Sequence, residues 1–180
     1  MKTITLVAAL LFSATAVFGQ DSSKPPQIGD KAPDFSLPYA TKDSVASEDL
    51  HLSTLFGKKN IILAFYPADW SGGCTKEVCT LRDNFASLSE LNATVLGISG
   101  DFEYSHREWA KFHNLPFILV SDHKQDVARA YASYNPESGY DRRTVYVIDK
   151  SGKIAYLDLK YSAGDISSFN KLKDALSKLK

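Results

Sequence analysis

The chain has 180 residues, two cysteines and a formal net charge of zero, from 21 basic and 21 acidic side chains. This balance excludes the classes of protein that bind nucleic acid through a net positive charge, so we expect no nucleic-acid partner. The length suits one domain whose core is large enough to fold without a disulfide.

The N-terminus has the pattern of a secretory signal peptide, which we assign to residues 1–19. Lys2 supplies a positive charge ahead of a mostly apolar run over residues 4–18, and this run is too short to span a bilayer. Small residues offer cleavage after Ala16 or after Gly19, of which we favour the second. We therefore expect an exported protein, periplasmic or secreted, without a membrane anchor. A buried N-terminal helix is the alternative.

The rest of the chain is expected to form a flexible lead and one domain. Residues 20–27 are polar and carry prolines, and the domain is expected to span 28–180. It begins with irregular structure that includes a helical turn at 53–57, after which apolar patterns predict strands and helices in alternation. The predicted strands cover 60–66, 94–99, 117–121, 143–149 and 153–158. The predicted helices cover 74–90, 104–113, 124–134 and 165–179.

The alternation of strands and helices predicts an α/β fold, with a central sheet and helices on both faces. Residues 149–152 have the sequence Asp-Lys-Ser-Gly, which predicts a hairpin turn between the last two strands. The sheet is therefore expected to be mixed. A cysteine at a strand-to-helix junction on such a sheet is the thioredoxin-like arrangement.

The last predicted helix, 165–179, is amphipathic. Its apolar face carries Ile166, Phe169, Leu172, Leu176 and Leu179. Such a helix more often docks on the core of its own domain than on a membrane surface, so we expect it to pack on the sheet.

Cys74 is the candidate nucleophile of the chain. It lies where the predicted strand 60–66 has ended and the predicted helix 74–90 begins, after turn residues at 67–73. Unpaired backbone N–H groups and the positive end of the helix dipole gather at such a position. Both favour a thiolate, which is the reactive form of cysteine.

Cys79 follows five residues later. Two cysteines in an exported chain suggest a structural disulfide, but positions i and i+5 of a helix have Cα atoms roughly 8–9 Å apart. This separation exceeds the reach of a disulfide, and a permanent bridge would destroy the helix. The spacing therefore favours a redox pair of Cys74 and Cys79. The alternative is that Cys79 is a small buried residue that only packs in the core.

The residues around Cys74 carry a resemblance to a known family. The run Pro67-Ala-Asp-Trp-Ser71-Gly-Gly-Cys74 resembles the peroxiredoxin signature Pro-x-x-x-Thr/Ser-x-x-Cys. With Cys79 it looks like the bacterioferritin-comigratory, or peroxiredoxin Q, branch of these AhpC/TSA-like thiol peroxidases. Segments 29–38, 97–106, 115–122 and 143–154 look like further parts of the family in the right order.

The resemblance implies the roles of the central residues. Cys74 would be the peroxidatic nucleophile and Cys79 the resolving thiol, with a redox-active disulfide between them. Arg143, six residues before Asp149, matches the family's arginine, which stabilises the thiolate. Arg142 would point to the other face of a strand. The alternative for Arg143 is a charge at the surface edge of a strand.

Three further residues have implied roles with simpler alternatives. Ser71 supplies a hydroxyl where the family usually has threonine, and it could instead be a plain helix cap. Pro67 shields the reactive sulfur in the family, and it could instead only end the strand. Glu77 pairs with the arginine in the family, and it could instead be a first-turn glutamate that favours the helix dipole.

Two segments depart from the family's usual pattern. Trp70 and Gly72 stand in the active loop where this branch more often has a polar residue and a proline. Residues 132–141 look shorter than the corresponding family stretch. The four histidines make no metal-binding spacing, and His106 is expected to form structural hydrogen bonds.

The resemblance implies a thiol-dependent peroxidase that reduces hydrogen peroxide and organic hydroperoxides through a sulfenic acid on Cys74. A thioredoxin-like dithiol would restore the enzyme, and no metal or other cofactor is implied. We expect a monomer, with a dimer as the alternative. A thioredoxin-like thiol–disulfide oxidoreductase stays open, although the four-residue gap between the cysteines replaces Cys-x-x-Cys. A non-catalytic binding module on the same fold is the third candidate.

Overall fold

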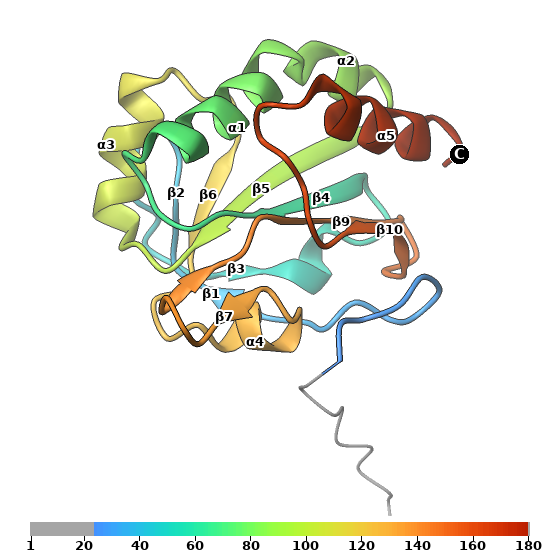
Figure 1. The fold of residues 1–180 in the computed structure, drawn as a ribbon, viewed down its shortest axis with the longest axis horizontal. Coiled ribbons are helices and arrows are strands. Elements are labelled where there is room, and N and C mark those ends of the chain that lie inside the picture. Colours follow the sequence, from blue (N-terminus) through green and yellow to red (C-terminus); the bar gives the residue numbers. More distant parts are fainter. Residues whose placement is uncertain (1–23, 180) are drawn as a thin grey trace, which may run out of the picture.

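The computed structural model describes residues 24–179 (Figure 1). The expected signal peptide lies outside these residues. Of the expected flexible lead, residues 24–27 are described, and they form irregular structure in which Pro26 is buried. The centre of the fold is a six-stranded sheet in the order β10-β9-β4-β5-β6-β2. Its strands are β2 (Tyr39–Ala40), β4 (Asn60–Phe65), β5 (Ala93–Ser99), β6 (Ile118–Ser121), β9 (Thr144–Ile148) and β10 (Ile154–Asp158).

The sheet is mixed, as predicted. Strands β4, β5 and β6 run parallel to one another, whereas β9 is antiparallel to β4, β10 to β9, and β2 to β6. The predicted hairpin turn at 149–152 is present between β9 and β10, and Gly152 there has a φ of 82°. Two small antiparallel pairs lie outside the sheet: β1 (Ser36–Leu37) with β3 (Leu50–His51), and β7 (Tyr134–Asn135) with β8 (Tyr140–Asp141).

Two hydrophobic cores lie on opposite faces of the sheet, because successive strand residues point to opposite sides. In β4, Ile62 and Ala64 face one core, and Ile61, Leu63 and Phe65 face the other. The helices are η1 (Leu52–Leu55), α1 (Gly72–Asp83), α2 (Phe85–Glu90), α3 (Glu103–Phe112), α4 (Asp126–Ala130) and α5 (Ile166–Ser177). Helices α1, α2, α3 and α5 cover the first face, and η1 and α4 cover the second (Figure 1).

The predicted helix 74–90 is wrong in two respects, because the structure divides it into α1 and α2 and starts it earlier. Asn84 interrupts it, and the side-chain amide of Asn84 donates to the carbonyl of Thr80 at 2.9 Å. Side chains that compete for backbone hydrogen bonds in this way disturb helices. At the other end, Ser71 caps the helix, so α1 begins at Gly72.

The predicted helix 124–134 is also wrong, because only the short α4 forms there. Gln125 before α4 and Ala132 after it have positive φ angles of 61° and 52°. Left-handed residues do not continue a right-handed helix, so the chain turns into β7 and β8. The other predicted strands and helices agree with the structure to within two residues at each end.

Helix α5 docks on the sheet, as predicted for the C-terminal helix. Phe169, Leu172 and Leu176 are buried in the core. Ile166 was expected on the same face and is instead 63% exposed, because it is the first helical residue beside the N-cap, Asp165. Within residues 24–179, none of the helices has the length and apolar character needed to cross a membrane.

Asp141 in β8 is an ionisable side chain placed in the protein interior. It is 3% exposed, and neither carboxylate oxygen has a hydrogen-bond partner among the described residues. Burial raises the pKa of Asp141 to about 8, and the charges of Asp122 and Asp101 act in the same direction. The folded protein therefore holds a proton that the unfolded chain releases near a pH of about 4.

We expect Asp141→Asn to flatten the dependence of stability on pH. In the natural chain, the contribution from the proton on Asp141 is fully present below a pH of about 4 and is lost as the pH rises towards about 8. Its slope is at most about 1.4 kcal/mol per pH unit. Urea unfolding of both proteins across this window measures the slopes. Equal slopes would show that Asp141 is already ionised in the folded state.

Candidate active site

Cys74 lies in the first turn of α1, directly after the loop that follows β4. Its side chain is fully buried, at 0% exposure. The hydroxyl oxygen of Ser71 accepts a hydrogen bond from the backbone N–H of Cys74 at 3.4 Å and so caps the helix. The thiol therefore lies at a helix N-terminus, where the backbone favours a negative charge.

One guanidinium joins Cys74 to a buried carboxylate. Arg143, which directly precedes β9, donates from Nη2 to the sulfur of Cys74 at 3.3 Å. It also donates from Nη1 to Glu77 Oε2 at 2.7 Å. By contrast, Arg142 is exposed and its side chain donates to the carbonyl of Tyr134. The strand alternation thus separates the two arginines as expected, and a positive charge lies against the sulfur.

Glu77 lies one turn along α1 from Cys74 and is fully buried. Of its two expected arrangements, the structure shows the pairing with Arg143. Burial raises the pKa of Glu77 to about 7, although the bond from Arg143 opposes this shift. As the pH falls below this value, the carboxyl gains a proton and loses the charge that holds the guanidinium in place.

Gly73 makes room for this arrangement. A Cβ atom at Gly73 would lie 2.6 Å from Arg143 Nη2, which is closer than real Cβ atoms approach a neighbour. The guanidinium therefore occupies the space that a side chain at this position would take. The sequence reasoning did not predict this space for the arginine, although the Gly-Gly pair before Cys74 was the available signal.

A buried hydrogen-bond network fixes the active loop. Asp69 Oδ2 lies 3.0 Å from Nδ1 of His106 and accepts from the hydroxyl of Ser105 at 2.7 Å, while Oδ1 accepts from Tyr66 at 2.9 Å. His106 is therefore a structural hydrogen-bonding residue, as expected. Asp69 was missed by the sequence reasoning, because two of its partners, Ser105 and His106, come from α3, more than thirty residues away.

Trp70, which departs from the family pattern, also connects this loop to α3. It has a left-handed backbone, with a φ of 61°, and its side chain is 54% exposed. The indole N–H donates to the hydroxyl of Ser105 at 3.2 Å, and the ring centroid lies 5.9 Å from that of Phe112. A left-handed tryptophan costs on the order of 1 kcal/mol, which these contacts help to offset.

The structure places the remaining expected residues less directly at the sulfur. The hydroxyl of Ser71 donates to the carbonyl of Ala68 at 3.2 Å, so in this state Ser71 is a helix cap rather than a donor to Cys74. Pro67 is partly buried and follows Tyr66 at the end of β4. This position is compatible with both of its expected roles, which are to shield the reactive sulfur and to end the strand.

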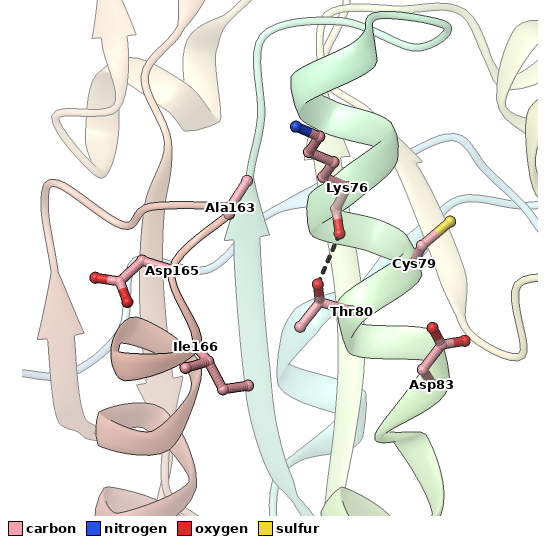
Figure 2. Close-up of a pocket in the computed structure, with 8 residues that line it drawn as sticks. Lys76, Cys79, Thr80, Asp83, Ala163, Asp165 and Ile166 are labelled. Atoms are coloured by element: carbon pink, nitrogen blue, oxygen red, sulfur yellow. Dashed lines mark hydrogen bonds between the residues drawn. The ribbon is translucent and has the colours of Figure 1, made fainter.

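Cys79 lies on the same helix as Cys74, and both cysteines are free thiols. Cys79 is partly buried. It borders a hollow of about 450 Å³ between α1 and the start of α5, and Figure 2 shows its sulfur on the side of α1 away from Ile166. The residues lining the hollow are Lys76, Cys79, Thr80, Asp83, Ala163, Gly164, Asp165 and Ile166.

The chain is similar in sequence and in structure to known peroxiredoxins. A model of the AhpC/TSA family matches residues 28–157. The peroxiredoxin Bcp of Bacillus subtilis is 34% identical over 134 residues, covering 71% of this chain and 82% of that protein. The chloroplastic peroxiredoxin Q of Triticum aestivum is 38% identical over 130 residues, covering 72% and 57% respectively. The structure of the peroxidoxin BcpB from Mycobacterium tuberculosis matches with a TM-score of 0.75 and 28% identity, over 86% of this chain and 99% of that chain.

Gly73→Ala should weaken the contact between Arg143 and Cys74 without unfolding the helix. The new Cβ would displace Nη2, which is the flexible end of the arginine side chain. Losing a hydrogen bond between charged groups, worth about 1.5–3 kcal/mol, should slow alkylation of Cys74 by iodoacetamide roughly tenfold or more at neutral pH.

Gly72→Ala is the matched control, because a Cβ there meets no atom within 4 Å. Mass spectrometry of the alkylated peptide separates Cys74 from Cys79 in both variants. If the two variants react at the same rate, the arginine contact does not control the reactivity of Cys74.

Proposed function

Because the chain belongs to the AhpC/TSA family of peroxiredoxins, we propose that it reduces hydrogen peroxide and organic hydroperoxides through a sulfenic acid on Cys74. As a peroxiredoxin it is a thiol-dependent peroxidase. The observation that carries the proposal is the contact of Arg143 Nη2 with the buried sulfur of Cys74 at 3.3 Å. It places a permanent positive charge where the nucleophile must be negative.

In the proposed first step, the Cys74 thiolate attacks one oxygen of the peroxide. A sulfur–oxygen bond forms, the oxygen–oxygen bond breaks, and the departing oxygen takes a proton and leaves as water or an alcohol. Negative charge develops on both oxygens, so donors aimed at them lower the barrier. Arg143 and the backbone N–H groups near Gly73 and Cys74 would supply these donors. Ser71 would join them if its hydroxyl turned away from Ala68.

In the proposed second step, Cys79 attacks the sulfenic sulfur of Cys74, a disulfide forms, and water leaves. On one regular helix, residues i and i+5 have Cα atoms roughly 8–9 Å apart, beyond the Cα separation of up to about 6.8 Å that a disulfide allows. No rotamer change closes this gap. The first turn of α1 must therefore unwind before the bond can form.

We propose a thioredoxin-like dithiol as the reductant and a monomer as the working form. Thiol–disulfide exchange with a dithiol would return both cysteines to the reduced state. The alternative function, an oxidoreductase acting on protein disulfides, is not favoured, because Cys74 is fully buried and out of reach of another protein's disulfide. Sedimentation of the reduced protein tests the monomer, and a dimer would contradict it.

We also propose export, with residues 1–19 as a cleaved signal peptide. The support is the charge of Lys2 ahead of the apolar run over 4–18. N-terminal sequencing of the mature protein from its native host tests this proposal. A mature chain that begins at residue 17 or 20 would support it, and one that retains residues 1–16 would contradict it.

Replacing each of the two cysteines with serine should affect peroxide turnover in a different way. Cys74→Ser should abolish peroxide consumption with dithiothreitol as reductant, because the nucleophile is gone. Cys79→Ser should consume one peroxide per chain at the natural rate and then stall, unless a small thiol replaces Cys79. Stopped-flow measurement of the first turnover separates these outcomes. Equal loss of the first turnover in both variants would rule out the assigned division of roles.

A further inference from the structure

A histidine contacts the sulfur of Cys79. Nδ1 of His113, the C-cap residue directly after α3, lies 3.9 Å from the sulfur of Cys79, which is within the range of a hydrogen bond to sulfur. The sulfur lies on the side of α1 away from Ile166 and α5 (Figure 2). The proposed resolving thiol is therefore directed towards a potential proton acceptor.

The histidine ring is held in place by its neighbours. It lies edge-on to Trp109 and to Phe112, with ring centroids 5.8 Å and 4.9 Å away. The carbonyl of His113 accepts a hydrogen bond from Arg82 Nη1 at 2.7 Å. This bond ties the C-terminal half of α1 to the end of α3 and would keep Cys79 beside His113 while the first turn of α1 opens.

The charges around His113 favour its neutral form. Burial lowers the pKa of His113, and the positive charge of Arg82 on α1 lowers it further. Arg82 is itself paired with Asp83 at 2.8 Å. From the N-terminal segment, Lys42 bonds to the neighbouring Asn114 at 2.8 Å. A neutral imidazole whose Nδ1 faces a thiol is able to accept its proton.

We propose that His113 is the general base of the resolving step, in which it accepts the proton of the Cys79 thiol. The sulfur of Cys79 then bonds to the sulfenic sulfur of Cys74, and the sulfur–oxygen bond breaks. The departing hydroxide takes up a proton, equivalent to the one that His113 received, and leaves as water. No further oxidant or reductant is needed. This inference rests on the proposed peroxidase function and assigns a residue to its second step.

The test measures the two steps separately in His113→Gln. Rapid mixing with peroxide, acid quenching, alkylation and mass spectrometry give the rates at which the sulfenic acid and the disulfide form. Because general base catalysis contributes typically 10²–10⁴-fold, we expect disulfide formation at neutral pH to slow by at least about tenfold while the peroxide step is unchanged. Added imidazole, or a pH above about 8.5 where a free thiol ionises unaided, should restore most of the rate.

His51→Gln is the matched control, because His51 is exposed on β3 and its side chain contacts Ser36 rather than a cysteine. His113→Asn provides a second variant if the glutamine variant does not fold. A disulfide step that is unchanged, or equally slow at every pH and with imidazole, would overturn the base role and leave the peroxidase function standing. If the natural protein forms no sulfenic acid, the proposed function fails and this inference fails with it.

Discussion

The active site depends on one guanidinium that lies between two groups of the same helix. Arg143 reaches from the start of β9 to the sulfur of Cys74 and to the carboxylate of Glu77, both on the first turns of α1. The bare backbone at Gly73 leaves the space for this approach. The positive charge therefore faces the thiol only while the start of α1 is helical and packed against the sheet.

The second step of the proposed reaction requires the first turn of α1 to open, because Cys79 cannot reach Cys74 along an intact helix. The two ends of α1 differ in stability in a way that allows both the helical and the opened state. Its first turn contains Gly72 and Gly73, each about 1 kcal/mol less favourable than alanine in a helix. Further along, Val78 and Leu81 are buried in the core, so opening would be confined to the N-terminal end, as local unfolding permits.

The sequence predicted the central strands well, because long apolar runs such as 60–66 are typical of buried strands. The resemblance to the family implied the role of Arg143, six residues before Asp149, and strand alternation set it apart from Arg142. The sequence could not decide the partner of Glu77, because a dipole-stabilising glutamate and an arginine-bound one occupy the same turn. Contacts between distant segments, such as His113 with Cys79, leave no local pattern, and strands of two residues are too short for periodicity to reveal.

Amide hydrogen exchange on the reduced and oxidised proteins tests the central claim that α1 must be helical for the first step and must open for the second. After one equivalent of peroxide, exchange should rise across residues 74–79, whose N–H groups lie in the first turn or bond to its carbonyls, and should stay slow in the end of α1 and in β4 and β5. Reduction with dithiothreitol should restore the protection. If the oxidised protein keeps the protection of the reduced one across 74–79, α1 does not open on oxidation, and the disulfide does not join Cys74 to Cys79 within one chain.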